Sequence, residues 1–316
     1  MSFIVREYLE KDFEEVFSIS DSVYGKRIGS FSLVSNLQDS RMLRKYVVTN
    51  EKERVIGYGL IWEQRTSPHL ILKVEILFNP DYEIVEMLFN KIINDIQIIG
   101  PYAIQARTFH DQIQLLQIYE KLGFVENHRM MHVYLPLADI DLTPFVEIES
   151  KLNSLGIVVT TLAEELVSDV DYFSKLHTLN NMTWADYPTE PLVPQSSPND
   201  QMLTHEDNIP DAYFIAKMGQ LYIGHSHLMK LPSDPQNLIQ GLTATLREFR
   251  GEGVATALKV KGIEFAKRMG YKGILTSTRD TNGPMEAVNR KLGWRPNYSE
   301  VRLEKILKSE QCHMGE

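Results

Sequence analysis

The sequence predicts an α/β protein made of two similar domains in tandem. Segments typical of strands and helices follow one another in the same order in residues 1–142 and in residues 156–316. The last helical segment ends alike in both halves, as Tyr119-Glu-Lys-Leu-Gly-Phe124 and as Asn289-Arg-Lys-Leu-Gly-Trp294. A chain of 316 residues also exceeds what one hydrophobic core usually accommodates. These observations indicate an internal duplication.

In the first half, apolar periodicity predicts a strand and a helix, then a hairpin, and then strands that alternate with helices. The expected strands are residues 3–9, 41–49, 55–63, 70–78, 102–109 and 128–137, and the expected helices are residues 10–24, 81–99 and 112–122. A charged turn at residues 51–54 joins the strands of the hairpin.

The second half repeats this order. Its expected elements are a strand over 157–161, a helix over 164–180, hairpin strands over 213–217 and 221–229, a strand over 238–246 and a helix over 254–270.

Residues 143–155 connect the halves. They contain Pro144, but the apolar residues Phe145, Ile148 and Leu152 stand at helical spacing, which predicts a packed segment and not a flexible linker. We place the domain boundary near Ser154.

Two glycines stand where the strand over 238–246 gives way to the helix, in Arg250-Gly251-Glu252-Gly253. Glycine lets a backbone approach a ligand closely, and the first helical turn presents N–H groups without internal partners at the positive end of the dipole. Such a turn binds phosphate, although the glycines alone are also compatible with a simple tight turn. The spacing excludes GxxxxGK[ST], and Thr256 stands where GxGxxG needs its third glycine. A different diphosphate-bearing ligand is therefore indicated.

The run LREFRGEGVATALK, followed by a strand, by Asn282-x-Pro284-Met285 and by Asn289 to Trp294, resembles the coenzyme A binding core of the GNAT superfamily of acetyltransferases. The resemblance implies two tandem GNAT-like domains, each a mixed, mostly antiparallel sheet flanked by helices. It also implies acetyl-CoA as cofactor, with its pyrophosphate on the glycine turn. Glu248 departs from the Gln or Arg that often begins this loop. The implied cofactor-binding residues are Thr245, Leu246, Glu248, Arg250, Gly251, Glu252, Gly253, Val254, Ala255, Thr256, Asn282, Met285 and Asn289.

The first half lacks the glycine loop. Its corresponding run, FNPDYEIVEMLFN, contains no glycine and places Glu83 and Glu86 near the helix start, where a phosphate would meet negative charge. This half resembles a GNAT domain that has lost its cofactor site. It retains Tyr119 where many members carry a proton-donating tyrosine, and we expect a packing or hydrogen-bonding role for it.

Acetyl transfer needs a neutral amine, a polarised thioester carbonyl and a proton for the departing thiolate. Residues 237–246 contain no carboxylate, and we expect a strand N–H near Ala244 or Thr245 to polarise the carbonyl. By resemblance Asn289 occupies the tyrosine position, where an amide has no proton to give at neutral pH. Similar tandem members carry Asn there, which implies that Asn289 contacts the pantetheine arm, and the thiolate could take its proton from the attacking amine or from water.

Other polar residues of the second half are weaker candidates. His225 and His227 share one face of a predicted strand and are candidate bases, with a structural role as the alternative. A metal site would need further ligands, so no metal is expected. By resemblance Asp186 and Glu190 lie where the acceptor binds, with a solvated loop as the alternative. Most cations near the core, which are Lys259, Lys261, Lys267, Arg268, Arg290 and Lys291, are expected on solvated helix faces.

Composition limits the partners. The formal net charge of −9 argues against nucleic acid and is compatible with a cationic amine. The one cysteine, Cys312, allows no disulfide within the chain, and no stretch approaches the roughly 18 apolar residues of a membrane span. We therefore expect a cytoplasmic protein without a membrane partner; the sequence indicates no oligomeric state.

The expected function is an N-acetyltransferase that uses acetyl-CoA and acts through its second half on a primary amine of a small molecule or peptide. The acceptor would attack the thioester directly in a ternary complex. The alternative is a non-catalytic acyl-CoA-binding or scaffold protein, which Asn289 and the missing strand carboxylate favour.

Overall fold

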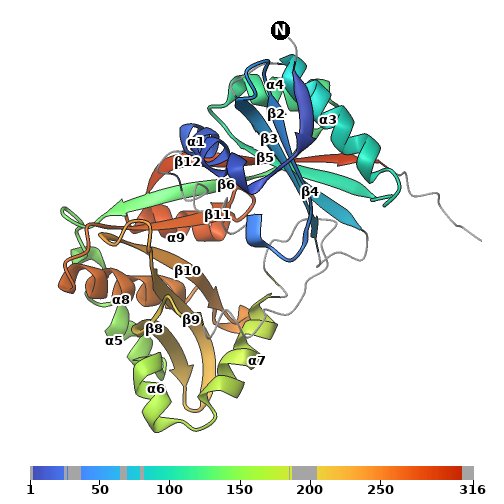
Figure 1. Ribbon diagram of the computed structural model, residues 1–316. Helices are drawn as coiled ribbons and strands as arrows, with labels where there is room; N and C mark the ends of the chain where they lie inside the picture. Colours follow the sequence, from blue (N-terminus) through green and yellow to red (C-terminus); the bar gives the residue numbers. More distant parts are fainter. Residues whose placement is uncertain are drawn as a thin grey trace, which may run out of the picture. The chain divides into compact units, whose positions relative to one another are not determined.

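The computed structural model describes residues 3–24, 27, 37–64, 70–78, 82–184, 186 and 205–307. They form a mixed α/β structure in which mostly antiparallel strands are flanked by helices, as predicted (Figure 1). Contacts group the chain into two compact units. Described residues up to Arg129 and from Glu300 onward form unit 1, and those from Met130 to Ser299 form unit 2.

Unit 1 contains a sheet in the order β1-β2-β3-β4-β5-β12, antiparallel except between β4 and β5. Its strands are β1 (Ile4–Glu7), β2 (Met42–Thr49), β3 (Val55–Gln64), β4 (Ile71–Phe78), β5 (Ala103–Phe109) and the last part of β12 (Arg295–Ile306), and its helices include α1 (Phe13–Tyr24), α3 (Tyr82–Ile96) and α4 (Ile113–Lys121). Tyr58 of β3 interacts with Ser20 of α1, whereas the next residue, Gly59, backs onto Leu88 and Ile92 of α3. Because successive strand residues point to opposite faces, α1 and α3 cover opposite faces of this sheet.

Unit 2 contains a sheet in the order β6-β11-β10-β9-β8-β7, parallel only between β10 and β11. Its strands are the last part of β6 (Val125–Pro136), β7 (Ile157–Thr161), β8 (Asn208–Met218), β9 (Leu221–Lys230), β10 (Asn237–Thr245) and β11 (Gly273–Arg279), and its helices include α5 (Ile148–Ser154), α6 (Leu162–Ser168), α7 (Tyr172–Trp184), α8 (Val254–Arg268) and α9 (Gly283–Lys291). Gly224 of β9 backs onto Val254 of α8, whereas His225 stacks on Tyr213, which interacts with Asn180 of α7. The helices α7 and α8 therefore lie on opposite faces.

Each half of the sequence gives its last strand to the sheet of the other half, which the sequence analysis did not predict. In unit 1, residues 300–306 of β12 pair with β5, from Glu300↔Phe109 to Ile306↔Ala103. In unit 2, residues 130–136 of β6 pair with β11, from Met130↔Arg279 to Pro136↔Gly273. The red strand β12 beside β5 and the green strand β6 beside β11 show this exchange in Figure 1. The units consequently do not coincide with the two halves of the sequence.

Most local elements agree with the periodicity, but β12 was not predicted and one expected helix is divided. Residues 164–180, expected as a single helix, form two, because α6 ends at Asp169, where the backbone is extended. The Asp169 carboxylate accepts hydrogen bonds from Lys175 (2.5 Å) and Tyr222 (3.1 Å), which hold the break. The connector is helical as predicted, with Leu152 of α5 buried.

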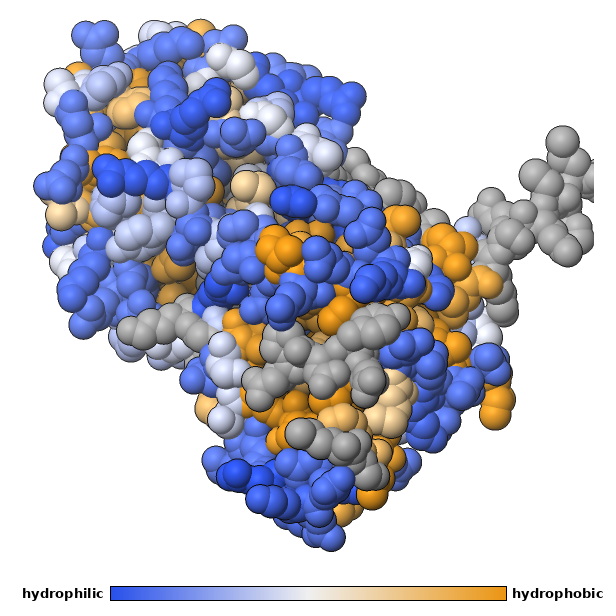
Figure 2. All heavy atoms as spheres, turned by 90° about the horizontal axis from the view of Figure 1, so that it is seen from above, coloured by the Kyte–Doolittle hydropathy of each residue, from blue (hydrophilic) through white to orange (hydrophobic). Residues whose placement is uncertain are grey.

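Apolar residues form the interior and hydrophilic residues predominate on the face seen in Figure 2, with apolar residues in smaller groups between them. The unit 2 core contains Leu228, Leu258 and Ile274 among its most buried residues. None of the helices in the described ranges has the length and apolarity needed to span a bilayer.

The strand exchange predicts how fragments of the chain behave. A fragment of residues 156–316 should melt at a lower temperature than one of residues 129–316, because only the longer one contains the strand that pairs with β11. A fragment of residues 137–316 keeps α5 but lacks β6, and so separates the two contributions. Circular dichroism melting curves provide the comparison, and equal melting of 129–316 and 137–316 would contradict the expectation.

Candidate active site

The two parallel strands of unit 2 separate after three paired residues. Pairing of β10 with β11 ends at Ile239↔Leu275, and the pairing of β10 with β9 is interrupted by a bulge between Gln240 and Thr243. A cavity of about 260 Å³ occupies this split. Its walls come from β10, β11, α7, α8 and α9, and consist of Trp184, Gln240, Gly241, Leu242, Thr243, Lys259, Thr276, Ser277, Thr278, Arg279, Asn282, Met285 and Asn289. Side chains from both faces of the sheet therefore meet at one opening between the strands.

The bulge is fixed by hydrogen bonds on one side and by a histidine ring on the other. The Gln240 amide donates to the His227 carbonyl (2.7 Å), and Thr276 donates to the Gln240 carbonyl (3.0 Å). A Cβ on Gly241 would lie 2.1 Å from Nε2 of His227, so only glycine fits at that position. The interruption in pairing lies at Gly241 and Leu242, whereas Ala244 and Thr245, where a carbonyl-polarising N–H was expected, are in register with β9. Backbone N–H groups beside the cavity are thus more accessible at the bulge.

Gly241→Ala should destabilise the protein by about 1–3 kcal/mol and disturb the bulge, because the added methyl group displaces the His227 ring. Denaturant unfolding measures the loss. Gly262→Ala in α8 is the matched control: its Cβ would meet Leu228 at an ordinary 3.6 Å, so no loss of stability is expected. Equal stability of both variants would show that the ring does not constrain Gly241.

The predicted phosphate loop has the backbone that its glycines permit. Gly251 and Gly253 have φ values of 84° and 96°, in the left-handed region, and Gly253 is the N-cap of α8. No side chain caps this helix, and no atom lies within 4 Å of a Cβ built on Gly251. The N–H groups of the first turn of this 15-residue helix therefore have no side-chain acceptor at its positive end, and the space beside Gly251 is open. An anion fits there.

The other predicted cofactor residues lie along this loop and the cavity. Thr245 ends β10 and is buried with Leu246, Glu248 is in the exposed turn before the glycines, and residues 254–256 form the first turn of α8. Asn282 is the N-cap of α9 and accepts a hydrogen bond from the Met285 N–H (3.3 Å). Asn289 is 3% exposed, and its Oδ1 is buried without a hydrogen-bond partner in the described structure. Asn282, Met285 and Asn289 line the cavity together, as the resemblance implies.

Lys259 was expected on a solvated helix face, and this expectation is wrong. Lys259 is only 2% exposed, and its Nζ lies 5.0 Å from the centroid of the Trp294 ring. Burial lowers the pKa of Lys259 to about 7. The helix α8 is covered around most of its circumference, which the stripe of apolar residues in its sequence does not reveal.

Known structures share this architecture. A GCN5-related N-acetyltransferase from Sphaerobacter thermophilus is 14% identical with a TM-score of 0.70, over 97% of this chain and 96% of that one. A tandem GNAT protein from the clavulanic acid biosynthesis pathway is 17% identical with a TM-score of 0.68, over 98% and 99% of the two chains. A glucosamine N-acetyltransferase region of a fungal multi-domain β-N-acetylglucosaminidase is 12% identical with a TM-score of 0.73, over 96% of this chain and 38% of that one. No family model and no curated protein matches the sequence.

The chain has a tandem GNAT fold.

Within this GNAT fold, the two histidines occupy the face of unit 2 covered by α7. His225 and His227 alternate on β9 as predicted, and both rings stack on Tyr213, with centroids 5.6 Å and 4.8 Å away. Desolvation lowers the pKa of His225 to about 3 and of His227 to about 4, so both are neutral at pH 7. Neither lines the cavity, and their role as bases stays a prediction. Among the described residues no three His, Cys, Asp or Glu side chains gather as metal ligands.

The predicted acceptor residue Asp186 contacts the predicted phosphate loop of the GNAT fold. Its carboxylate accepts hydrogen bonds from Arg247 and from Arg250 (2.7 Å), and Arg250 also donates to the Thr245 carbonyl (3.1 Å). The hydrogen bond from Arg247 lowers the pKa of Asp186. The Asp186 carboxylate is thus paired with Arg247 and Arg250 of the loop, and its contact with an acceptor stays a prediction. Glu190 lies outside the described residues.

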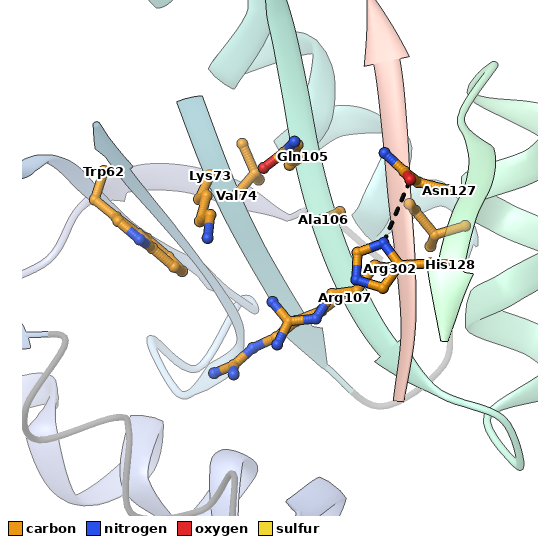
Figure 3. A pocket seen from close by; sticks show the side chains of 10 residues that line it. Trp62, Lys73, Val74, Gln105, Ala106, Arg107, Asn127, His128 and Arg302 are labelled. Carbon is orange, nitrogen blue, oxygen red and sulfur yellow. Dashed lines mark hydrogen bonds between the residues drawn. The ribbon is translucent and has the colours of Figure 1, made fainter. Parts of the chain in front are cut away.

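Unit 1 of the GNAT fold has a smaller cavity at the corresponding split, where pairing of β4 with β5 ends at Val74↔Ala106. The cavity measures about 130 Å³, and Figure 3 shows Trp62, Lys73, Arg107 and Arg302 on one side of it and Asn127, which is hydrogen-bonded to His128, on the other. Its lining residues are Trp62, Lys73, Val74, Gln105, Ala106, Arg107, Asn127, His128, Arg302 and Leu303.

Carboxylates behind this cavity neutralise its cations. Glu75, which is 1% exposed, accepts hydrogen bonds from Tyr58 and Arg107, both at 3.0 Å. Glu300 lies 2.5 Å from Arg302. Tyr119 is buried against Phe124, and desolvation raises its pKa. Its burial agrees with the packing role expected for it. An internal ion-pair network therefore lies beside the cavity of unit 1, at the position that corresponds to the cavity of unit 2.

Proposed function

We propose that this protein is an acetyl-CoA-dependent N-acetyltransferase whose active site lies in unit 2. The observation that carries the proposal is the combination of an uncapped α8 N-terminus at Gly251 and Gly253 with an open split between β10 and β11. The first element provides N–H donors for a diphosphate and the second an opening between strands for an extended arm. The resemblance to proteins named N-acetyltransferases agrees with this assignment.

Carbonyl polarisation, binding of the pantetheine arm and approach of the acceptor each have a candidate in this geometry. Backbone N–H groups at Gly241 or Leu242 polarise the thioester carbonyl, since the bulge takes them out of the ladder. Asn282, Met285 and Asn289 hold the pantetheine arm along α9. The acceptor approaches from the α7 face, where Trp184 lines the cavity. The substrate class we propose is a primary amine of a small molecule or peptide, which agrees with the net charge of −9.

Binding and turnover test the proposal separately. Isothermal titration of the full chain with acetyl-CoA should give one binding event per chain, because unit 1 lacks the glycine loop. Release of CoA is then followed with a panel of amines of increasing size and charge. Binding without turnover on any amine would favour a non-catalytic acyl-CoA-binding protein, and absence of binding would exclude both.

A further inference from the structure

Lys259 is a buried cation that the fold does not pair. Within the part of the chain that the structure describes, its ammonium has neither a hydrogen-bond acceptor nor an ion-pair partner, and its one polar contact is the Trp294 ring. Burial without a partner destabilises a charged group strongly, so an apolar side chain of the same length would suit the folding of α8 better. The side chain lines the cavity of unit 2, which indicates that its partner is a ligand in that cavity.

The position of Lys259 along α8 matches that of the bulge. Lys259 follows the N-cap Gly253 by six residues, which is about 9 Å along a helix axis. In a strand–helix–strand crossover the helix runs back along the strand, and 9 Å corresponds to about three strand residues. Gly224, which pairs with Thr245, lies against Val254 at the start of α8, so counting back from Thr245 places Lys259 level with Leu242. The lysine and the carbonyl-polarising N–H groups therefore lie at the same depth, from two sides of the split.

The surroundings leave both forms of the amine accessible near pH 7. Desolvation is what lowers the pKa of Lys259 to about 7, while the face of Trp294 attracts the charged form. Besides Lys259, the one titratable side chain among the residues that line the cavity is Arg279 of β11, and His227 of β9, whose ring lies against Gly241, is neutral. On α5, Glu149 pairs with Lys261 and Lys151 with Glu252, so neither carboxylate neutralises Lys259. The site therefore provides no anion to pair with Lys259, and the thiolate of a bound ligand would be such an anion.

We propose that Lys259 is the catalytic acid of unit 2: its ammonium faces the sulfur of CoA, stabilises the departing thiolate and protonates it. This rests on the proposed function. The acceptor nitrogen attacks the thioester carbon, the C–N bond forms, and the C–S bond breaks with its electron pair going to sulfur. Sulfur takes a proton from Nζ, and the neutral amine of Lys259 then takes the proton that the acylated nitrogen loses. One proton moves from the acceptor to CoA, and Lys259 ends as it began. It supplies the proton that Asn289 has no means of giving.

The test measures the thiol of bound CoA, because that needs no acceptor. Ultraviolet absorbance of the thiolate is followed against pH for CoA bound to the wild type, to Lys259→Met and to Lys259→Arg, with the single cysteine subtracted as unliganded protein. The affinities for CoA and desulfo-CoA are compared at pH 7.5. Lys261→Met is the matched control on the same helix, since Lys261 pairs with Glu149 outside the cavity.

The wild type and Lys261→Met should hold CoA with a thiol pKa below the usual value of about 8.5. Lys259→Met should raise this thiol pKa by about one unit or more. It should also lose a preference of about tenfold for CoA over desulfo-CoA. Lys259→Arg should keep the low thiol pKa but lose turnover, because arginine does not release a proton. Lys259→Met should also melt at a higher temperature, since an uncompensated buried cation is gone.

The outcomes separate this inference from the proposed function. If the wild type binds neither CoA nor acetyl-CoA, the proposed function fails and the inference fails with it. If the wild type binds CoA with a thiol pKa at or above about 8.5, or if Lys259→Met leaves that pKa unchanged, Lys259 does not meet the sulfur although the cofactor site stands. Full turnover by Lys259→Arg would show that a fixed positive charge suffices and would overturn proton donation.

Discussion

Gly251→Asp should lower the affinity for acetyl-CoA at least 100-fold, about 2.7 kcal/mol. The added carboxylate would stand in the open space at the N-terminus of α8, where the proposed site holds the diphosphate. It would interact favourably with the helix dipole itself, so the ligand would meet both a filled site and a like charge. Isothermal titration calorimetry measures the affinity, and circular dichroism checks the fold.

Gly270→Asp is the matched control for this variant. Gly270 also has a left-handed backbone, with φ of 80°, and no atom lies within 4 Å of its Cβ position, but it follows the C-terminal end of α8. Both variants therefore carry the same backbone strain and the same added charge. Gly270→Asp should bind acetyl-CoA normally. Equal loss of binding in both would mean that strain in α8, and not the phosphate site, explains the effect.

Arg107→Met should destabilise the protein by about 3–5 kcal/mol, because it leaves a buried carboxylate without its cation. Glu75 is 1% exposed and lies 3.0 Å from Arg107, which also lies 3.9 Å from Glu300 and packs over the Tyr24 ring. Methionine replaces the length of the side chain but none of its hydrogen bonds. Denaturant unfolding followed by tryptophan fluorescence measures the loss.

A double variant separates charge from packing at this position. Glu75→Gln with Arg107→Met removes both charges and should recover most of the stability lost in the single variant. If the double variant is as unstable as Arg107→Met, the loss comes from packing against Tyr24 and not from the unpaired carboxylate.

The sequence predicted the local elements well because their signals are local. The strand over 70–78 was found as Ile71–Phe78, and the helix over 254–270 as Val254–Arg268. The left-handed turn before α8 was predicted because glycine marks such backbone geometry directly, whereas the binding of phosphate there stays a prediction. The break in the helix at Asp169 was missed, since one of the two contacts that hold it comes from Tyr222, more than fifty residues away.

Non-local features account for the other errors. A charged residue on a helix is normally solvated, and only the packing of unit 2 shows that Lys259 faces a cavity. The contact of Asp186 with Arg247 and Arg250 likewise depends on where α7 ends relative to the loop. The exchange of last strands was missed because both halves offer strands of similar pattern, and the sequence does not tell which sheet each one joins.

The exchange of last strands has a consequence for synthesis on the ribosome. The edge of β5 is complete only when residues 300–306 emerge, almost 200 residues after β5 itself. At 5–20 residues per second that edge waits on the order of 10–40 s. An unpaired strand edge is a template for pairing with other chains. Nascent chains of this protein should therefore need protection by a chaperone until translation ends, and truncated products should aggregate through the edge of β5.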